Sequence, residues 1–299
     1  MGGEIMILNV SGRTDIVAYY TPWFLNRIKA GFFDVRNPFY PKQVSRIFYR
    51  DVDAIVFCTK NPIPIIPHLS EIQKPCVFHI TITPYKKEIE PHIPPKRKII
   101  EAAKQVSNVI GKRFVYIRYD PIFLNSTYTL DYHVRAFRHL CELLDGYTTH
   151  IIVSFLDHYK NVDKNKDILD EHPLTEKDYE FIGTNFSAIA KEHHMTVQTC
   201  AEHRNLKEYG FIVDDCISKN LAYLLTKKTN FKEWKARNKM CHCVEMVDIG
   251  AYNSCFHKCK YCYANYSEEK IESNMKQHDP NSSLLIGTLS DEDQIKTRK

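Results

Sequence analysis

Short apolar runs alternate with helical patterns along most of the chain, and this alternation limits the possible folds more than any other feature. Seven runs rich in β-branched residues predict strands at residues 5–9, 54–58, 77–82, 114–119, 150–155, 195–199 and 244–249. Helical patterns lie between them, at residues 22–30, 41–49, 95–109, 131–144 and 176–193. Parallel neighbours need helical crossovers, so this order predicts an α/β fold with a parallel sheet, either open or closed as a full or partial (β/α) TIM-type barrel.

Polar, turn-forming residues follow the predicted strands. In a barrel such strand ends meet at one mouth, where catalytic residues sit. The candidates there are Arg13, Asp15, Lys60, Arg118, Asp120 and Glu202. Structural roles stay open for them, because Asp is a good helix N-cap and an inward Arg–Asp pair can simply tie barrel layers together.

Composition allows one barrel-sized domain. The chain has 299 residues, of which 43% are apolar and 26% charged, and its formal net charge is +5. We expect a single domain over residues 1–278, a charged, solvated loop near residues 159–178, and a tail over residues 279–299. The sequence contains no signal peptide and no run of apolar residues long enough to span a membrane. These features predict a soluble, cytoplasmic protein with no membrane partner.

Cysteines are the strongest functional signal. The chain has 10 of them, and in a reducing compartment clustered cysteines more often bind metal than form disulfides. Five lie close together: Cys241, Cys243, Cys255, Cys259 and Cys262. Closely spaced cysteines are typical of iron–sulfur sites. Zinc is the alternative, although the spacing of Cys241 and Cys243 is tighter than in common zinc knuckles.

The segment Cys255-Phe-His-Lys-Cys259-Lys-Tyr261-Cys262 has the CxxxCxφC form, in which φ is aromatic, and it resembles the motif of the radical S-adenosylmethionine enzymes. The resemblance implies that the three cysteines hold a 4Fe-4S cluster whose fourth iron binds the amino and carboxylate groups of S-adenosylmethionine. It also implies that Tyr261 lies near the adenine. The activity expected is cleavage to a 5′-deoxyadenosyl radical that abstracts hydrogen from an unknown substrate, with a low-potential electron donor as partner.

The position of this motif differs from that of the superfamily, which carries it near the N-terminus of the barrel. Here it follows the last predicted strand and precedes a helical stretch at residues 264–276. We therefore expect a circularly permuted barrel in which residues 241–278 form the cluster-binding unit. In such a barrel, the strand before Cys255 lies beside the strand that begins near Ile5.

Two further resemblances concern longer parts of the chain. A Thr-Lys after one strand, a Thr-containing strand with an acidic loop, and an Asp-Pro after the next strand resemble spore photoproduct lyase-like radical enzymes; the segments are residues 57–61, 79–83, 88–90, 96–103 and 118–122. Nearly the whole chain resembles the bacterial family catalogued as domain of unknown function 1848. That resemblance rests on residues 11–15, 57–62, 118–122, 199–202, 216–217, 241–243, 248–255 and 261–265.

A second set of cysteines lies outside the motif. Cys200 and Cys216, together with Cys241 and Cys243, are enough for a second cluster or a zinc tetrathiolate, although Cys200 alone could be ordinary core. If they bind metal, their four sulfur atoms should converge in space. Cys58, Cys76 and Cys141 lie in apolar contexts and are expected to be structural.

A basic stretch with aromatics covers residues 227–239 and could follow a phosphate backbone. An amphipathic helix with a solvated basic face is the favoured explanation, so nucleic acid is the less favoured partner. For Arg13 and Asp15, we expect contacts with the ionic groups or ribose of S-adenosylmethionine. The alternative function is a non-catalytic structural protein that binds zinc or an iron–sulfur cluster.

Overall fold

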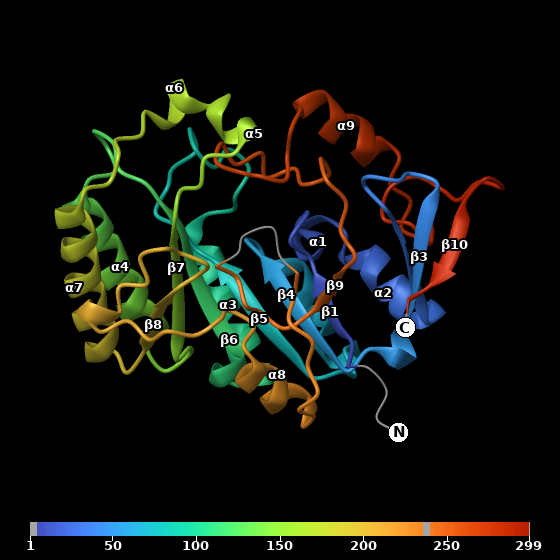
Figure 1. The fold of residues 1–299 in the computed structure, drawn as a ribbon, viewed down its shortest axis with the longest axis horizontal. Coiled ribbons are helices and arrows are strands. Elements are labelled where there is room, and N and C mark those ends of the chain that lie inside the picture. Colours follow the sequence, from blue (N-terminus) through green and yellow to red (C-terminus); the bar gives the residue numbers. More distant parts are fainter. Residues whose placement is uncertain (1–4, 236–239, 299) are drawn as a thin grey trace.

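A parallel sheet forms the centre of the molecule (Figure 1). The computed structural model describes residues 5–235 and 240–298. The 7-stranded sheet has the order β8-β7-β6-β5-β4-β1-β9. Its strands are β1 (Ile7–Val10), β4 (Ala54–Thr59), β5 (Cys76–Thr81), β6 (Val115–Ile122), β7 (His150–Phe155), β8 (Thr196–Thr199) and β9 (Met246–Asp248). The predicted strands and the α/β class are confirmed. Within the described ranges no pairing joins β8 to β9, so the sheet is open and a closed barrel is not formed.

The last strand of this sheet lies next to the first. β9 pairs in parallel with β1, with Ile7 opposite Met246 and Asn9 opposite Asp248. Figure 1 shows these two strands side by side although they come from opposite ends of the chain. The expected neighbourhood of the strand before Cys255 and the strand near Ile5 is therefore confirmed.

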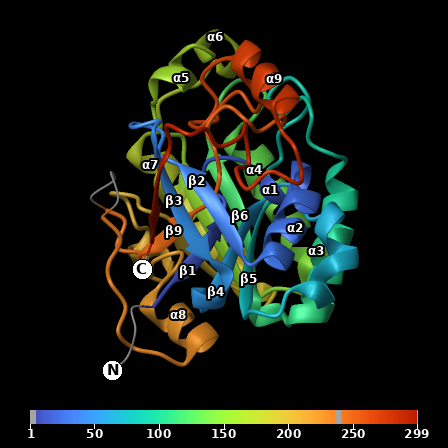
Figure 2. The same ribbon diagram turned by 90° about the vertical axis from the view of Figure 1, so that its right-hand side faces the viewer.

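The two faces of the sheet have different covers, because side chains alternate along each strand. Phe57 and Phe78 belong to the larger core, which the helices α2 (Thr21–Ala30), α3 (Lys96–Ile110), α4 (Leu130–Leu144) and α7 (Glu176–Glu192) complete. Val56 and Val77 belong to the smaller core on the opposite face, together with α8 (Lys219–Thr226). Figure 2 shows α8 on one side of the sheet and α2 and α3 on the other.

A small second sheet corrects one prediction. Its strands are β2 (Phe32–Arg36), β3 (Gln43–Phe48) and β10 (Gln294–Thr297), in the order β10-β3-β2. The helix predicted for residues 41–49 is therefore wrong. Val44 and Ile47 are both buried and lie three positions apart, a spacing that also suits a helix. In the structure this segment is instead a strand with partners on both sides.

The segment expected to be a tail contains β10 and packs onto the molecule. Leu284 and Leu285 are buried, Nε1 of Trp23 donates to the carbonyl of Ser282 at 2.9 Å, and Arg36 forms an ion pair with Asp293. The charged segment expected to be a solvated loop contains two short helices, α5 (Lys160–Asp163) and α6 (Lys166–Leu169). The remaining helices are α1 (Ile16–Tyr19) and α9 (Glu268–Lys276), the latter within the predicted helical stretch.

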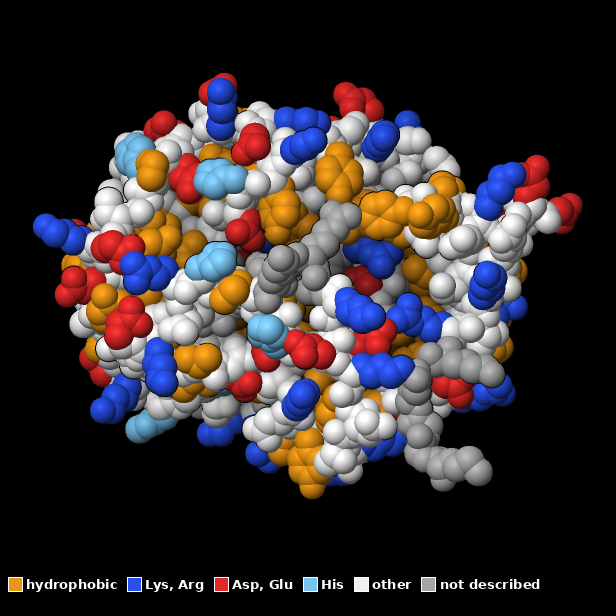
Figure 3. All heavy atoms as spheres, in the orientation of Figure 1, with side chains coloured by type: hydrophobic (Ala, Val, Ile, Leu, Met, Phe, Trp, Pro, Cys, Tyr) orange, Lys and Arg blue, Asp and Glu red, His pale blue; other side chains and the backbone are white. Residues whose placement is uncertain are grey.

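The described part of the basic stretch, residues 227–235, does not form the amphipathic helix that was favoured. α8 ends at Thr226, and Glu233 forms an isolated bridge with Val244. Lys228 is paired with Asp53, and basic and acidic side chains are interspersed on the face shown in Figure 3. Arg237 and Lys239, which were part of the predicted stretch, lie outside the described residues. Among the residues described, no helix is long and apolar enough to cross a membrane.

Candidate functional site

The three motif cysteines lie on the loop that joins β9 to α9, at the carboxyl ends of the strands. Cys255 and Cys259 are buried and Cys262 is half-buried. Cys255 is close enough to Cys259 and Cys262 for their charges to interact. Burial raises the pKa of each of the three thiols, and the nearby Lys60 opposes this rise at Cys259 and Cys262. The three thiols of this loop thus lie near one another and near a cation. In the part of the chain that is described, no group of three or more His, Cys, Asp or Glu side chains is already arranged to hold a single metal ion.

Asparagine side chains fold this loop. Oδ1 of Asn253 accepts from the backbone N–H of Tyr266 at 2.5 Å, and Nδ2 of Asn265 donates to the carbonyl of Cys255 at 2.8 Å. From the segment predicted to be solvated, Asn161 donates to the carbonyl of Cys262, and Asn165 donates to that of Lys260 at 2.6 Å. Sequence reasoning missed these two anchors because a charged stretch suggests exposure.

Asp15 joins the loop to the first and second strands of the chain's parallel sheet, β1 and β4. It is the N-cap of α1, and Oδ1 accepts from the N–H of Ala18 at 2.9 Å and from Thr59 at 2.8 Å. Oδ2 accepts from the N–H of Lys60 at 2.8 Å and lies 2.9 Å from Nε2 of His257. Both carboxylate oxygens are thus occupied by protein groups. The structure supports the capping alternative for Asp15 and adds His257, which sequence reasoning left out.

Arg13 lies at the junction of β1 and β9. Its Nε is 3.7 Å from Oδ1 of Asp248, and a guanidinium nitrogen donates to the carbonyl of Gly250 at 3.4 Å. Asp248 also accepts from the side chain of Ser11 and from the N–H groups of Gly12 and Gly250, each at 2.7 Å. An acidic residue ending a strand could have marked Asp248 as a site residue.

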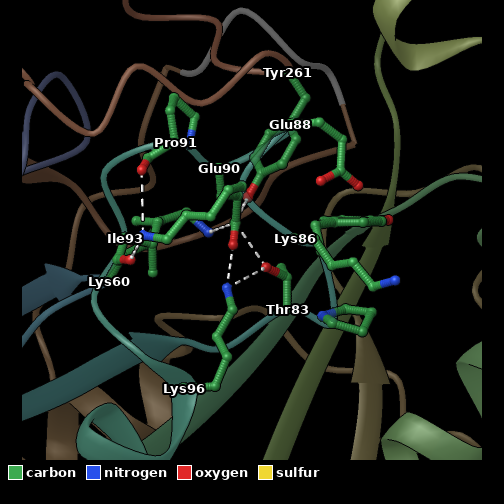
Figure 4. Close-up of polar contacts among 12 residues, drawn as sticks. Lys60, Thr83, Lys86, Glu88, Glu90, Pro91, Ile93, Lys96 and Tyr261 are labelled. Atoms are coloured by element: carbon green, nitrogen blue, oxygen red, sulfur yellow. Dashed lines mark hydrogen bonds and ion pairs between the residues drawn. The ribbon is translucent and has the colours of Figure 1, made fainter.

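A buried ionic cluster lies against the cysteine loop (Figure 4). Glu90, which is 1% exposed, accepts from Lys60 at 3.0 Å and from Thr83 at 2.7 Å, and it also contacts Lys96 and the hydroxyl of Tyr261. Burial alone would raise the pKa of Glu90, but Lys60 and Lys96 outweigh it and lower that pKa to about 2. The carboxylate therefore stays ionised. Glu90 and Lys96 were not predicted as site residues, although both lie in segments that carry the lyase resemblance.

The cluster also fixes Tyr261. Its hydroxyl donates to Glu90, its ring is buried, and Nζ of Lys60 lies 5.2 Å from the ring centroid. An adenine contact would therefore involve an edge or face of a ring that the protein already orients.

Arg118 and Asp120 lie within β6, and Glu202 lies just beyond the end of β8. Nε of Arg118 donates to Oδ2 of Asp120 at 2.8 Å, and Ser154 donates to the other oxygen. Glu202 accepts from the N–H of Phe155 at 2.8 Å. Burial, followed by the nearby charges of Asp157 and Asp120, raises the pKa of Glu202 to about 7 against that hydrogen bond. Arg118 and Asp120 thus form the paired arrangement that was the structural alternative, and Glu202 carries a carboxyl group that is protonated more readily than an ordinary glutamate.

The structure brings the four other candidate cysteines only partly together. Sγ of Cys216 is 3.4 Å from Sγ of Cys243, and Cys241 packs in the same cluster of side chains. Cys200 lies near enough to Cys216, and Cys241 to Cys243, for each pair of thiols to interact. The convergence of all four sulfur atoms around one point stays a prediction. Cys76 and Cys141, by contrast, pack within the larger core, as expected of structural cysteines.

Comparison with known proteins adds a family but no activity. No curated protein matches the chain. A solved structure, a sugar phosphate isomerase/epimerase from Parabacteroides distasonis ATCC 8503, matches with 8% identity and a TM-score of 0.28, over 67% of this chain and 52% of that one. The chain thus covers about half of that structure's length. The family described as domain of unknown function (DUF1848) matches residues 7–264, which is most of the chain. The protein therefore belongs to this family.

Proposed function

We propose that this protein is a radical S-adenosylmethionine enzyme whose cluster-binding unit lies in the C-terminal part of the chain, next to the edge strand β9 of the open sheet. The observation that carries the proposal is the placement of the Cys255–Cys259–Cys262 loop: it follows β9, and β9 lies beside β1. This neighbourhood is the one expected if the superfamily's first strand–loop–helix unit has become the last.

The donor set suits the cofactor. Three thiols in one loop, two of them buried and one half-buried, can hold three corners of a 4Fe-4S cluster and leave the fourth iron open. When bound, the cluster supplies an electron that cleaves S-adenosylmethionine to methionine and a 5′-deoxyadenosyl radical, which abstracts hydrogen from the substrate. Lys60 places a positive charge beside Cys259, which compensates the negative charge of thiolate ligands.

The residues around the thiols position the loop and keep water away. His257, held between Asp15 and the hydroxyl of Tyr19, fixes the segment between the first two cysteines. Glu90 fixes Tyr261 just before the third. Asp15 thus acts through His257 and is a positioning residue rather than a cofactor ligand. Arg13 and Lys60 are the cations near the carboxyl ends of the strands that can bind the carboxylate of S-adenosylmethionine.

On or just beyond the strands further from the cysteine loop, β6 and β8, the side chains of Arg118, Asp120 and Glu202 are proposed to face the substrate. Glu202, with its pKa raised to about 7, can exchange a proton near neutral pH. A low-potential donor is needed to reduce the cluster, and nucleic acid is not favoured as a partner.

The test is cleavage of S-adenosylmethionine by anaerobically reconstituted protein with a low-potential reductant. We expect slow formation of 5′-deoxyadenosine and methionine. Cys259→Ala should abolish both products, whereas Cys141→Ala, a matched change of a buried cysteine in α4, should retain them. Fully loaded protein that neither binds nor cleaves S-adenosylmethionine would contradict the proposal. Zinc without acid-labile sulfide as the only bound metal would instead support the structural alternative.

A further inference from the structure

Cys200, Cys216, Cys241 and Cys243, here called the four-thiol group, come from three separate parts of the chain. Cys200 directly follows β8, Cys216 precedes α8, and Cys241 and Cys243 precede β9. Sγ of Cys216 lies 3.4 Å from Sγ of Cys243, and Cys241 packs beside them in the smaller core. Cys200 lies near enough to Cys216 for their thiols to interact. Ordinary core cysteines pack singly among apolar side chains, so a group of four from distant segments calls for a specific cause.

Two nitrogen-bearing side chains, one half-buried and one buried, lie near these sulfur atoms. The half-buried Arg118 guanidinium interacts with the charges of Cys200 and Cys216. His79 of β5 is 1% exposed, and the group whose charge acts most strongly on it is Cys216. Among the described residues, Nε2 of His79 has no hydrogen-bond partner. Buried polar atoms are normally satisfied, so this one indicates a missing ligand at the four-thiol group.

We propose that Cys200, Cys216, Cys241 and Cys243 form a second metal centre, in which four thiolates bind a thiophilic metal as an iron–sulfur cluster or as zinc. Four thiolates complete the ligand set of either one. A tetrahedral zinc with bonds of about 2.3 Å holds its sulfurs roughly 3.8 Å apart. The observed separation of 3.4 Å is close to this, and a cluster needs the sulfurs to move further apart.

The sulfurs are not yet arranged around one point, in keeping with the lack of a preformed metal shell among the described residues. This arrangement is what protonated thiols adopt, because each S–H can bond to the next sulfur. Thiolates have no such protons and repel one another. Loss of the protons and entry of a metal cation would therefore move the four sulfur atoms apart until they surround the metal. A structural disulfide would leave two sulfurs without a role, since Cys216 contacts both Cys200 and Cys243.

The proposed centre is separate from the motif cysteines. Cys243 belongs to the smaller core, which α8 covers, whereas Cys259 belongs to the larger one. Cys58 lies between the two groups, because charges on both Cys216 and Asp15 act on its thiol. The second centre therefore lies on the face of the sheet that α8 covers. It does not depend on the proposed radical chemistry.

Metal content tests the centre independently of activity. The background is the full chain with Cys255→Ser, Cys259→Ser and Cys262→Ser, reconstituted anaerobically with ferrous iron and sulfide, or in parallel with zinc. We expect it to retain about four iron atoms with sulfide, or about one zinc without sulfide. Adding Cys216→Ser and Cys243→Ser should remove this metal completely. Adding Cys76→Ser and Cys141→Ser instead, as a matched pair of cysteines in or beside the larger core, should not.

Wild-type protein gives a second measurement that needs no variant to fold. It should bind about eight irons, or about four irons and one zinc, with sulfur ligands in X-ray absorption of the metal. About four irons and no zinc would overturn the proposal if the background protein binds no metal, since all the iron would then belong to the motif cysteines. So would a background protein that binds neither metal, or equal metal loss in the Cys76/Cys141 control. Because none of these measurements uses S-adenosylmethionine, failure of the radical proposal would leave their outcome readable.

Discussion

Single residues determine the charge balance around the cysteine loop, and Glu90 is the clearest case. A buried carboxylate is stable as an ion only when cations compensate for its lost hydration, and Lys60 and Lys96 do so here. The carboxylate in turn holds Tyr261, so one residue links the charge of the β4 and β5 ends to the position of the loop.

Replacing Glu90 by Gln should therefore destabilise the protein strongly. The change leaves two half-buried ammonium groups without their buried anion, and removal of one partner of a buried ion pair costs about 3–5 kcal/mol. Tyr261→Phe is the matched control, since it removes one hydrogen bond to the same carboxylate and should cost about 1 kcal/mol. Urea unfolding measures both. Equal free energies of unfolding for the two variants would show that the lysines do not need Glu90.

His133 of α4 makes stability depend on pH. It is 0% exposed, Nδ1 lies 2.9 Å from the hydroxyl of Tyr119, and Nε2 lies 2.9 Å from the carbonyl of Phe123. Burial lowers the pKa of His133 to about 4, from an ordinary value of 6.5. As pH falls below 6.5, His133 binds a proton in the unfolded chain but not in the folded protein. Stability should thus fall between pH 6.5 and about 4, and His133→Gln should weaken this dependence in urea titrations at several pH values. An unchanged slope in the variant would assign the acid sensitivity to other groups.

Prediction from sequence was most successful for residues that follow a strand. The three motif cysteines and Asp15 all lie after strands, and Asp is a common helix N-cap. The place of these residues and the capping role of Asp15 could therefore be foreseen. His257 and Glu90 could not, because their importance comes from partners far along the chain, Asp15 and Tyr261. Such pairings are created by the fold and leave no local pattern.

At the scale of elements, predictions held for the central sheet and failed at its margin. Several strands of that sheet, such as β1 and β4, are short apolar runs buried on both faces, which gives a strong local signal. β3 has only two buried apolar side chains, Val44 and Ile47, and its pairing with β2 and β10 decides its conformation. No local pattern announces a partner strand at residues 294–297.

The β1–β9 junction depends on a close approach at Gly250. A Cβ placed there would lie 2.0 Å from Oγ and 2.8 Å from Cβ of Ser11. Gly250→Ala should therefore force the two segments apart and cost about 1–3 kcal/mol, as overpacking generally does. Because Ser11 supplies the clash, adding Ser11→Gly should restore part of the loss, so the double variant will be more stable than the sum of the single effects. Thermal or urea unfolding of the three variants tests this. Purely additive losses would place the strain elsewhere.

At the scale of the whole molecule, the cysteine loop acts as a strap across the strand ends. Tyr20 donates to the carbonyl of Ser254 at 2.5 Å, the N–H of Lys260 donates to the carbonyl of Ile89 at 3.0 Å, and Asn165 holds Lys260 from the other side. These contacts reach the segments after β1, β5 and β7. None of these hydrogen bonds reaches the helices α4 and α7. Those two helices pack on each other through Phe137 and Phe186, whose ring centroids are 3.8 Å apart.

Loss of metal from the loop should therefore loosen the segments that are hydrogen-bonded to the loop and leave the rest of the fold unchanged. A bound cluster would fix the loop at three points, so its removal should increase hydrogen exchange in residues 250–266 and in the segments they hold, near residues 15–20, 86–93 and 160–165. The backbone of α4 and α7 should keep its protection, because it depends on the larger core. Hydrogen exchange of reconstituted and chelated protein, read by mass spectrometry, measures this. The Cys259→Ala variant should show the chelated pattern under both conditions. A change of equal size in α4 and α7 would mean that metal binding is coupled to global folding, and no change near residues 86–93 would contradict the link through Lys260.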